Sequence, residues 1–143
     1  MMETQTAGKV ELRIPSRPEF VGVARLAVAA VASRMGFTFD DIEDIKVSVG
    51  EALANAIQHA AEEARPQDEV VVCCWLDPEE LVIEVRDRGR GFDPDTARQA
   101  ARGDELAESG LGLLLIESLM DEVEFQARPD QGTQVRMVKR RTR

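Results

Sequence analysis

The segment from Glu51 to His59 carries three side chains whose types and spacing could do chemistry. Glu51, Asn55 and His59 recur every four residues, so in a helix they lie along one face. The amide oxygen of Asn55 suits Mg²⁺, a hard ion that keeps several waters beside one or two protein ligands. Glu51, one turn away, could accept a proton from a hydroxyl group or a water molecule. Taken alone, the same spacing also fits the solvated edge of an ordinary helix.

A second polar segment, Asp87 to Phe92, follows directly on a predicted strand. Gly89 and Gly91 in the sequence DRGRGF allow the backbone to approach a ligand closely. The carboxylate of Asp87 at the strand end could accept a hydrogen bond from the exocyclic amine of an adenine ring. The competing interpretation is a tight or bulged turn without a ligand.

A third segment, Ser109 to Ile116, leads from a polar loop into an apolar helix and reads SGLGLLLI. Backbone N–H groups at a helix N-terminus suit phosphate, and Gly110 and Gly112 would leave them accessible. The lysine of a Walker A loop is absent, and the spacing is not that of a dinucleotide-binding fingerprint. By itself, this glycine pattern is a weak indication of phosphate binding.

The composition sets conditions on any phosphate site. The chain has 143 residues with 27 Asp and Glu against 18 Lys and Arg, and the net charge of −9 disfavours nonspecific binding to nucleic acid or anionic lipid. A polyphosphate must therefore be held locally, by backbone N–H groups or a metal ion. The adjacent Cys73 and Cys74 are expected to be free thiols in a strand, because neighbouring strand residues point to opposite faces. No apolar run approaches the ~20 residues of a membrane span, which favours a soluble, cytoplasmic protein.

The elements that position these segments follow from apolar periodicity. Strands are predicted at 10–14, 69–76, 81–86, 123–127 and 133–139, and helices at 18–35, 40–63, 95–101 and 111–120. This order predicts an α+β fold with a mostly antiparallel sheet and helices on one face. We expect a single domain over 9–139, an N-terminal tail of residues 1–8 and a basic C-terminal tail of residues 140–143.

The ends and buried faces of the first two helices follow from local signals. Asp40 and Glu43 resemble a capping box at the start of the second helix. The first helix is expected to end at Gly36 and to bury one apolar stripe. The residues of this stripe are Phe20, Val23, Ala27, Ala30 and Val31. The second helix is expected to bury an apolar face made of Ile42, Ile45, Val49, Leu53, Ala56, Ile57 and Ala60.

In this order, and in a chain of this length, the three segments resemble the N, G1 and G2 boxes of the GHKL ATPases. The matching residues are Glu51, Asn55, Ala56 and His59, then Asp87, Gly89 and Gly91, and finally Gly110, Gly112 and Leu113. The stretch 110–124 closely resembles the anti-sigma-factor serine kinases of the RsbW and SpoIIAB type. A histidine kinase is disfavoured, because the only histidine, His59, lies inside the N box. The resemblance covers about residues 9–139.

The resemblance implies a two-layer α/β sandwich of the Bergerat type that binds ATP and Mg²⁺. It implies a homodimeric kinase that sequesters a sigma factor and phosphorylates a serine of an anti-anti-sigma STAS-domain protein, in the stress response or in sporulation. It implies no direct contact with nucleic acid or with a membrane. Two alternatives stay open: a switch kinase that binds no sigma factor, and a non-catalytic, ATP-gated binding module.

Residue by residue, the resemblance makes Glu51 the general base, Asn55 the magnesium ligand and Asp87 the adenine contact. The other nucleotide-binding residues that it implies are Gly89, Gly91, Ser109, Gly110, Leu111, Gly112, Leu113 and Thr133, the last at a phosphate-contacting position. His59 either packs near the nucleotide or has a purely structural role.

Two arginines complete the expected site. Arg25, on the first helix, is expected to contact a protein partner, with a freely solvated arginine as the alternative. Arg102 could add positive charge near the γ-phosphate, although a solvated arginine is an equally good interpretation. The loop 102–109 is short and contains no lysine, so a lid over the triphosphate would be partly open.

Overall fold

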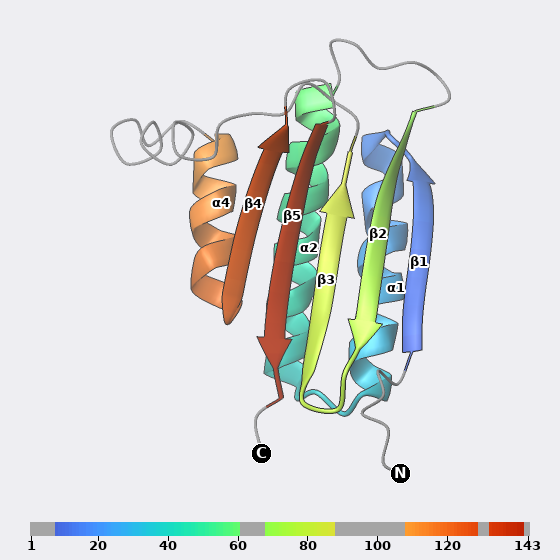
Figure 1. Cartoon of the computed structure of the whole chain (residues 1–143), viewed down its shortest axis with the longest axis vertical. Helices are drawn as coiled ribbons and strands as arrows, with labels where there is room; N and C mark the ends of the chain where they lie inside the picture. The colour runs from blue at the N-terminus through green and yellow to red at the C-terminus, as the bar shows by residue number, and fades with distance from the viewer. Residues whose placement is uncertain (1–7, 61–67, 88–107, 129–131, 142–143) are drawn as a thin grey trace.

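A computed structural model describes residues 8–60, 68–87, 108–128 and 132–141 of the chain. In this part of the protein, five strands form one sheet, and the helices α1, α2 and α4 lie side by side against one of its faces (Figure 1). The predicted α+β architecture is confirmed. The predicted helix at 95–101 lies outside the described residues. None of the described helices is both long and apolar enough to span a membrane.

The sheet has the strand order β1-β2-β3-β5-β4, and each of the four pairings is antiparallel. Its strands are β1 (Gly8–Pro15), β2 (Glu69–Leu76), β3 (Glu80–Arg86), β4 (Glu122–Arg128) and β5 (Gly132–Arg140). Asp77 and Glu80 exchange backbone hydrogen bonds of 3.0 and 3.3 Å, which closes the hairpin between β2 and β3. Arg141 donates its backbone N–H to Glu79 of the same turn, so the ordered chain continues beyond the predicted last strand.

Residue alternation explains why only one face of the sheet carries helices. Every second residue of the central strands is apolar and buried: Val70, Val72, Cys74, Leu81, Ile83, Val85, Val135 and Met137. The alternate positions on β1, β3 and β5 are largely charged, and several form ion pairs across the open face. A period of two with one apolar side is what a half-buried sheet requires.

The two cysteines are free, as predicted, and both are buried. Burial raises the pKa of the Cys74 thiol to about 12. Burial also raises the pKa of Cys73, whose Sγ lies 3.6 Å from the Glu11 carboxylate. Both thiols therefore stay protonated at neutral pH.

The helix α2 (Phe39–Ala60) begins one residue earlier than expected. The hydroxyl of Thr38 accepts a hydrogen bond from the Asp41 N–H at 3.1 Å, and the Thr38 carbonyl accepts the Ile42 N–H. Thr38 is therefore the N-cap, and the predicted capping box at Asp40 and Glu43 is wrong. The apolar face is confirmed: Ile45, Val49, Leu53, Ala56 and Ile57 are buried. The predicted end at Glu63 lies outside the described residues.

The helix α1 (Val21–Arg34) follows a short 3₁₀ turn, η1 (Pro18–Phe20). It ends at Gly36, as predicted: Gly36 has a φ of 86°, and the Phe37 N–H bonds the Ala32 carbonyl in the pattern of a Schellman motif.

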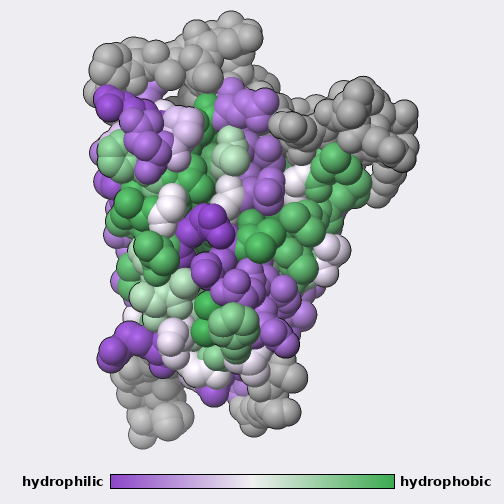
Figure 2. Space-filling model, turned by 180° about the vertical axis from the view of Figure 1, so that it is seen from behind, coloured by the Kyte–Doolittle hydropathy of each residue, from purple (hydrophilic) through white to green (hydrophobic). Residues whose placement is uncertain are grey.

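The predicted buried stripe of α1 is only partly correct, because Phe20 and Val31 pack against the core but are only half-buried. The buried residues are Ala24, Val28 and Ala32, whereas Val23 is 54% exposed. The helix is apolar on nearly all sides, so its periodicity does not select a face. Its exposed side carries Val23 and Leu26, and Figure 2 shows apolar side chains on this outer surface of the helical layer.

Candidate functional site

The elements that carry the three predicted segments and Thr133 meet at one end of the molecule. The C-terminal end of α2, the C-terminal end of β3, the start of β5 and the start of α4 (Glu108–Leu119) all lie at the upper end in Figure 1. In the chain, these segments span residues 51 to 133. The fold therefore gathers them at a single edge of the two-layer sandwich.

Contact between α2 and α4 brings Glu51 and Asn55 against Gly112. A Cβ atom at position 112 would lie 2.6 Å from Glu51 Oε2 and 3.5 Å from Asn55 Nδ2. Only a residue without a side chain leaves the Glu51 carboxylate its observed position beside α4. Two motifs that are 61 residues apart at Glu51 and Gly112 are thus in direct contact.

The Asn55 side chain has the properties of a ligand group. It is 4% exposed, and its Nδ2 atom is buried without a hydrogen-bond partner among the described residues. A buried amide N–H without an acceptor costs free energy unless a ligand atom accepts its hydrogen bond. A carboxamide beside a carboxylate fits Mg²⁺, which takes oxygen ligands and retains water. In the described ranges, no group of three or more His, Cys, Asp or Glu side chains could hold a metal ion.

Asp87 and Thr133 lie side by side where β3 ends and β5 begins. The Asp87 N–H donates to the Thr133 carbonyl at 3.0 Å. Asp87 is 7% exposed and Thr133 is 4% exposed, and the Thr133 hydroxyl has no partner in the described part of the chain. The sheet register therefore places the predicted adenine contact and the predicted phosphate contact next to each other.

The helix α4 starts at Glu108, three residues before the predicted start at Leu111. Ser109 and Gly110 consequently belong to its first turn, which carries the free N–H groups of a helix N-terminus. The prediction that the residues before Leu111 belong to a loop is therefore wrong for 108–110. Leu113 is fully buried in the core and Leu111 is 42% exposed, so neither side chain offers a polar contact to a nucleotide.

Some predicted site residues are placed only in part. His59 lies in the last turn of α2. Gly89, Gly91 and Arg102 lie outside the described residues, as does most of the loop 102–109.

Arg25 is not a freely solvated arginine. Its side chain crosses α2 at Gly50, where a Cβ atom would lie 3.0 Å from Arg25 Cδ and 3.2 Å from Nε. Its Nε is buried without a partner among the described residues. Gly50 directly precedes Glu51, so Arg25 reaches from α1 to the helix that carries the carboxylate.

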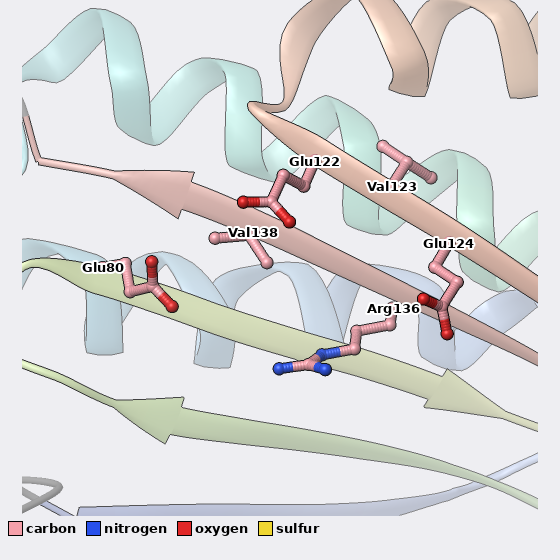
Figure 3. A pocket seen from close by; sticks show the side chains of 6 residues that line it. All are labelled: Glu80, Glu122, Val123, Glu124, Arg136 and Val138. Atoms are coloured by element: carbon pink, nitrogen blue, oxygen red, sulfur yellow. The ribbon is translucent and has the colours of Figure 1, made fainter.

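A depression on the opposite side of the sheet does not belong to this site. It is lined by Glu80, Glu122, Val123, Glu124, Arg136 and Val138, and Figure 3 shows the helices behind the strands that carry them. Arg140 pairs with Glu122 and with Glu80 on this face. The carboxylates that line the depression are partly neutralised by arginines, which is typical of a solvated sheet surface.

Lys139 is a buried charged residue that sequence reasoning missed. It is 8% exposed, and its ammonium group donates to the Leu119 carbonyl at 2.6 Å. The signal was present in the sequence, because Lys139 has the same parity on its strand as the inward-facing Val135 and Met137.

Comparison with known proteins identifies relatives over almost the whole chain. Residues 14–139 match the model of a family described as histidine kinase-like ATPase domain. The serine-protein kinase RsbW of Bacillus velezensis is 44% identical over 137 residues, covering 91% of this chain and 84% of that protein. The serine-protein kinase RsbW of Bacillus subtilis is 43% identical over 127 residues, covering 84% of this chain and 79% of that protein.

Solved structures share the fold. The RsbU and RsbW domains of a Mycobacterium tuberculosis protein superpose with a TM-score of 0.71 at 19% identity, covering 96% of this chain and 33% of that one. The SiaB–SiaC complex of Pseudomonas aeruginosa gives a TM-score of 0.68 at 14% identity, covering 90% of this chain and 88% of that one.

Proposed function

The chain belongs to the histidine kinase-like ATPase domains and, within them, to the serine-protein kinases of the RsbW type, and we propose how its site carries out that function. It is an ATP-dependent protein serine kinase. We propose that its phosphoacceptor is an anti-anti-sigma protein of the STAS type, and that it also sequesters a sigma factor as a cytoplasmic homodimer. The observation that carries the mechanism is the contact of Glu51 and Asn55 with Gly112.

Nucleotide binding is assigned to groups at the shared edge. The Asp87 carboxylate accepts a hydrogen bond from the adenine amine, and the first turn of α4 presents its N–H groups to the phosphates. The Thr133 hydroxyl, which lacks a partner in the described residues, donates to a phosphate oxygen. Asn55 would hold Mg²⁺, which when bound neutralises charge on the transferred phosphoryl group.

Glu51 acts on the hydroxyl group of the phosphoacceptor serine. Its carboxylate is held against the start of α4, on the side where the phosphates are expected. The serine oxygen forms the new bond to the γ-phosphorus, the bond to the leaving ADP oxygen breaks, and Glu51 accepts the serine proton. Because phosphoryl transfer depends mainly on positioning and charge stabilisation, the fixed position of the carboxylate matters as much as its basicity.

Two single variants separate these roles. Glu51→Ala should bind Mg-ATP and the protein partner nearly as well as wild type, while single-turnover transfer of labelled γ-phosphate falls by roughly 10²–10⁴-fold. Asn55→Ala should lose magnesium-dependent nucleotide affinity as well as turnover, because a metal ligand acts in the ground state too. Glu117→Ala, which removes an exposed carboxylate of α4, is the matched control and should leave both quantities unchanged.

The results for Glu51→Ala have direct consequences. Near-normal transfer would remove the general-base role and leave a kinase that works by positioning alone. Loss of nucleotide binding would instead indicate that Glu51 is a ligand of the metal ion. If wild-type protein transfers no phosphate with partner present, the chain is a non-catalytic binding module.

Partner binding is tested separately. Purified chain should retain a sigma factor from the same cell and a STAS-domain protein, and the identity of that sigma factor decides between a stress and a sporulation role. Arg25→Ala should weaken retention of a protein partner without changing ATP affinity, because Arg25 lies against α2 at Gly50 and its buried Nε has no partner among the described residues. Retention of the STAS protein alone would favour a switch kinase that binds no sigma factor. Sedimentation of the chain tests the homodimer.

A further inference from the structure

Lys139 occupies a position on β5 where strand alternation calls for an apolar residue. The preceding inward-facing residues, Val135 and Met137, are 4% and 0% exposed, and Lys139 continues their row at 8%. A buried ammonium group is costly unless it is paired and hydrogen-bonded. The structure supplies such partners.

The ammonium group of Lys139 joins three elements. It donates to the carbonyl of Leu119, the last residue of α4, at 2.6 Å. It lies 3.4 Å from Asp44 Oδ2 and 3.9 Å from Asp41 Oδ1, both near the start of α2. A cation at this position meets the negative end of the α4 dipole and one of the carbonyls that a helix C-terminus leaves unpaired. Lys139 on β5 therefore fastens the end of α4 to the beginning of α2.

The opposite end of the same helix pair is the candidate active site. The first turns of α4 carry Gly112, where a methyl group would displace the Glu51 carboxylate of α2 from its observed position. A 12-residue α-helix is about 18 Å long, so a change of its tilt at the C-terminus also displaces its N-terminal turn. The position of α4 relative to α2 is thus defined by a steric fit at one end and by Lys139 at the other.

We infer that Lys139 is a positioning residue of the kinase. It fixes α4 against α2 so that the first turn of α4, which binds phosphate in the proposed function, keeps its position next to Glu51. This inference rests on the proposed function for its effect on catalysis, but not for its effect on α4. The ammonium group suits the role because its three donors face three oxygens from two helices. An apolar side chain of the same length would fill the space without holding either helix.

The test compares Lys139→Met with Lys46→Met. Methionine keeps the length and apolar stem of lysine and removes the charge. Lys46 pairs with Glu43 within α2 itself, at 3.2 Å, so its replacement controls for the loss of one lysine and one ion pair. Asp44→Asn keeps the shape of the side chain and weakens its attraction to the Lys139 ammonium group. If Lys139→Met does not fold, the same measurements are made on Asp44→Asn.

Two measurements are made on each variant. Amide hydrogen exchange without nucleotide should be faster in α4 of Lys139→Met, while the amides of β2 and β3 exchange as in wild type. ATP affinity and the single-turnover rate at saturating ATP should both fall, the rate by about 10- to 100-fold, as expected when a reacting group is misplaced by about 1 Å. Lys46→Met should change neither.

The inference is overturned if α4 exchange, ATP affinity and transfer rate all stay at wild-type values in Lys139→Met and in Asp44→Asn. It is also overturned if exchange accelerates equally in α4 and the sheet, because Lys139 then contributes only to global stability. If wild-type protein binds no ATP, the proposed function fails, whereas faster exchange confined to α4 would still support the positioning role.

Discussion

Gly112→Ala tests whether the contact between α2 and α4 positions the catalytic carboxylate. The new methyl group would lie 2.6 Å from Glu51 Oε2, and ordinary contact begins at 3.4 Å, so the carboxylate has to retreat by about 0.8 Å. Asn55 Nδ2 would lie at 3.5 Å and can stay in place. The substitution therefore displaces one functional group and leaves its neighbour.

We expect Gly112→Ala to lower the rate of phosphoryl transfer and not the stability of the fold. The displaced atom is the end of a flexible side chain, and alanine is favoured over glycine inside a helix by about 1 kcal/mol. The urea midpoint should therefore change little or rise. A shift of about 1 Å in a reacting group can cost about 10²-fold in rate, so we expect single-turnover transfer to fall by roughly 10- to 100-fold. ATP affinity should change much less than the rate.

A double-mutant cycle with Glu51→Ala identifies the cause. If Gly112→Ala acts by moving the Glu51 carboxylate, it should cost almost nothing more in a chain that already lacks that carboxylate. An equal loss in both backgrounds would refute the reasoning and assign Gly112 to direct phosphate binding. A wild-type rate for Gly112→Ala would show that the position of the carboxylate is not limiting.

Three further outcomes follow from particular contacts. Asp87→Asn should weaken ATP binding by about 1–3 kcal/mol in calorimetry, because it leaves a buried polar contact unsatisfied. An unchanged affinity in a folded variant would show that the adenine pocket does not lie at Asp87. Thr38→Ala should lower the free energy of unfolding in urea by about 1 kcal/mol, since it removes the N-cap of α2, whereas Thr38→Ser should not. At pH 8, Cys73 and Cys74 should resist thiol reagents in the folded protein and react on unfolding, because burial raises both pKa values, that of Cys74 to about 12; rapid labelling of native protein would contradict this burial.

The two long helices show what apolar periodicity can predict. In α2, charged and apolar residues alternate with the helical period, and the predicted face, including Ile45, Val49 and Leu53, is the buried one. In α1, apolar residues occur on nearly every side, so the buried face is selected by contact with α2 and not by the sequence of α1 itself. The buried residues there are the small Ala24 and Ala32 with Val28, which allow the two helices to approach closely.

The candidate site was predictable where it depends on local spacing. The four-residue interval between Glu51 and Asn55 predicts a shared helix face, and both side chains lie next to Gly112. Their contact with Gly112 was not predictable, because it depends on how α4 packs against α2. Strand parity indicates that Lys139 faces inward, but its partners, Asp44 and Leu119, were not predictable for the same reason, since they are 95 and 20 residues away in the sequence.

The buried polar atoms without partners among the described residues connect the fold to its ligands. Asn55 Nδ2 and Thr133 Oγ1 lie at the edge assigned to the nucleotide, and Arg25 Nε lies on the helix assigned to protein partners. The fourth, Ser48 Oγ, sits in mid-helix, where a serine hydroxyl can turn to the carbonyl one turn before it. For the other three atoms, a hydrogen bond to a ligand would remove the cost of a buried polar group without a partner, which is about 1–3 kcal/mol. A ligand that supplies these hydrogen bonds therefore stabilises the folded protein as it binds, and the same atoms favour the bound state.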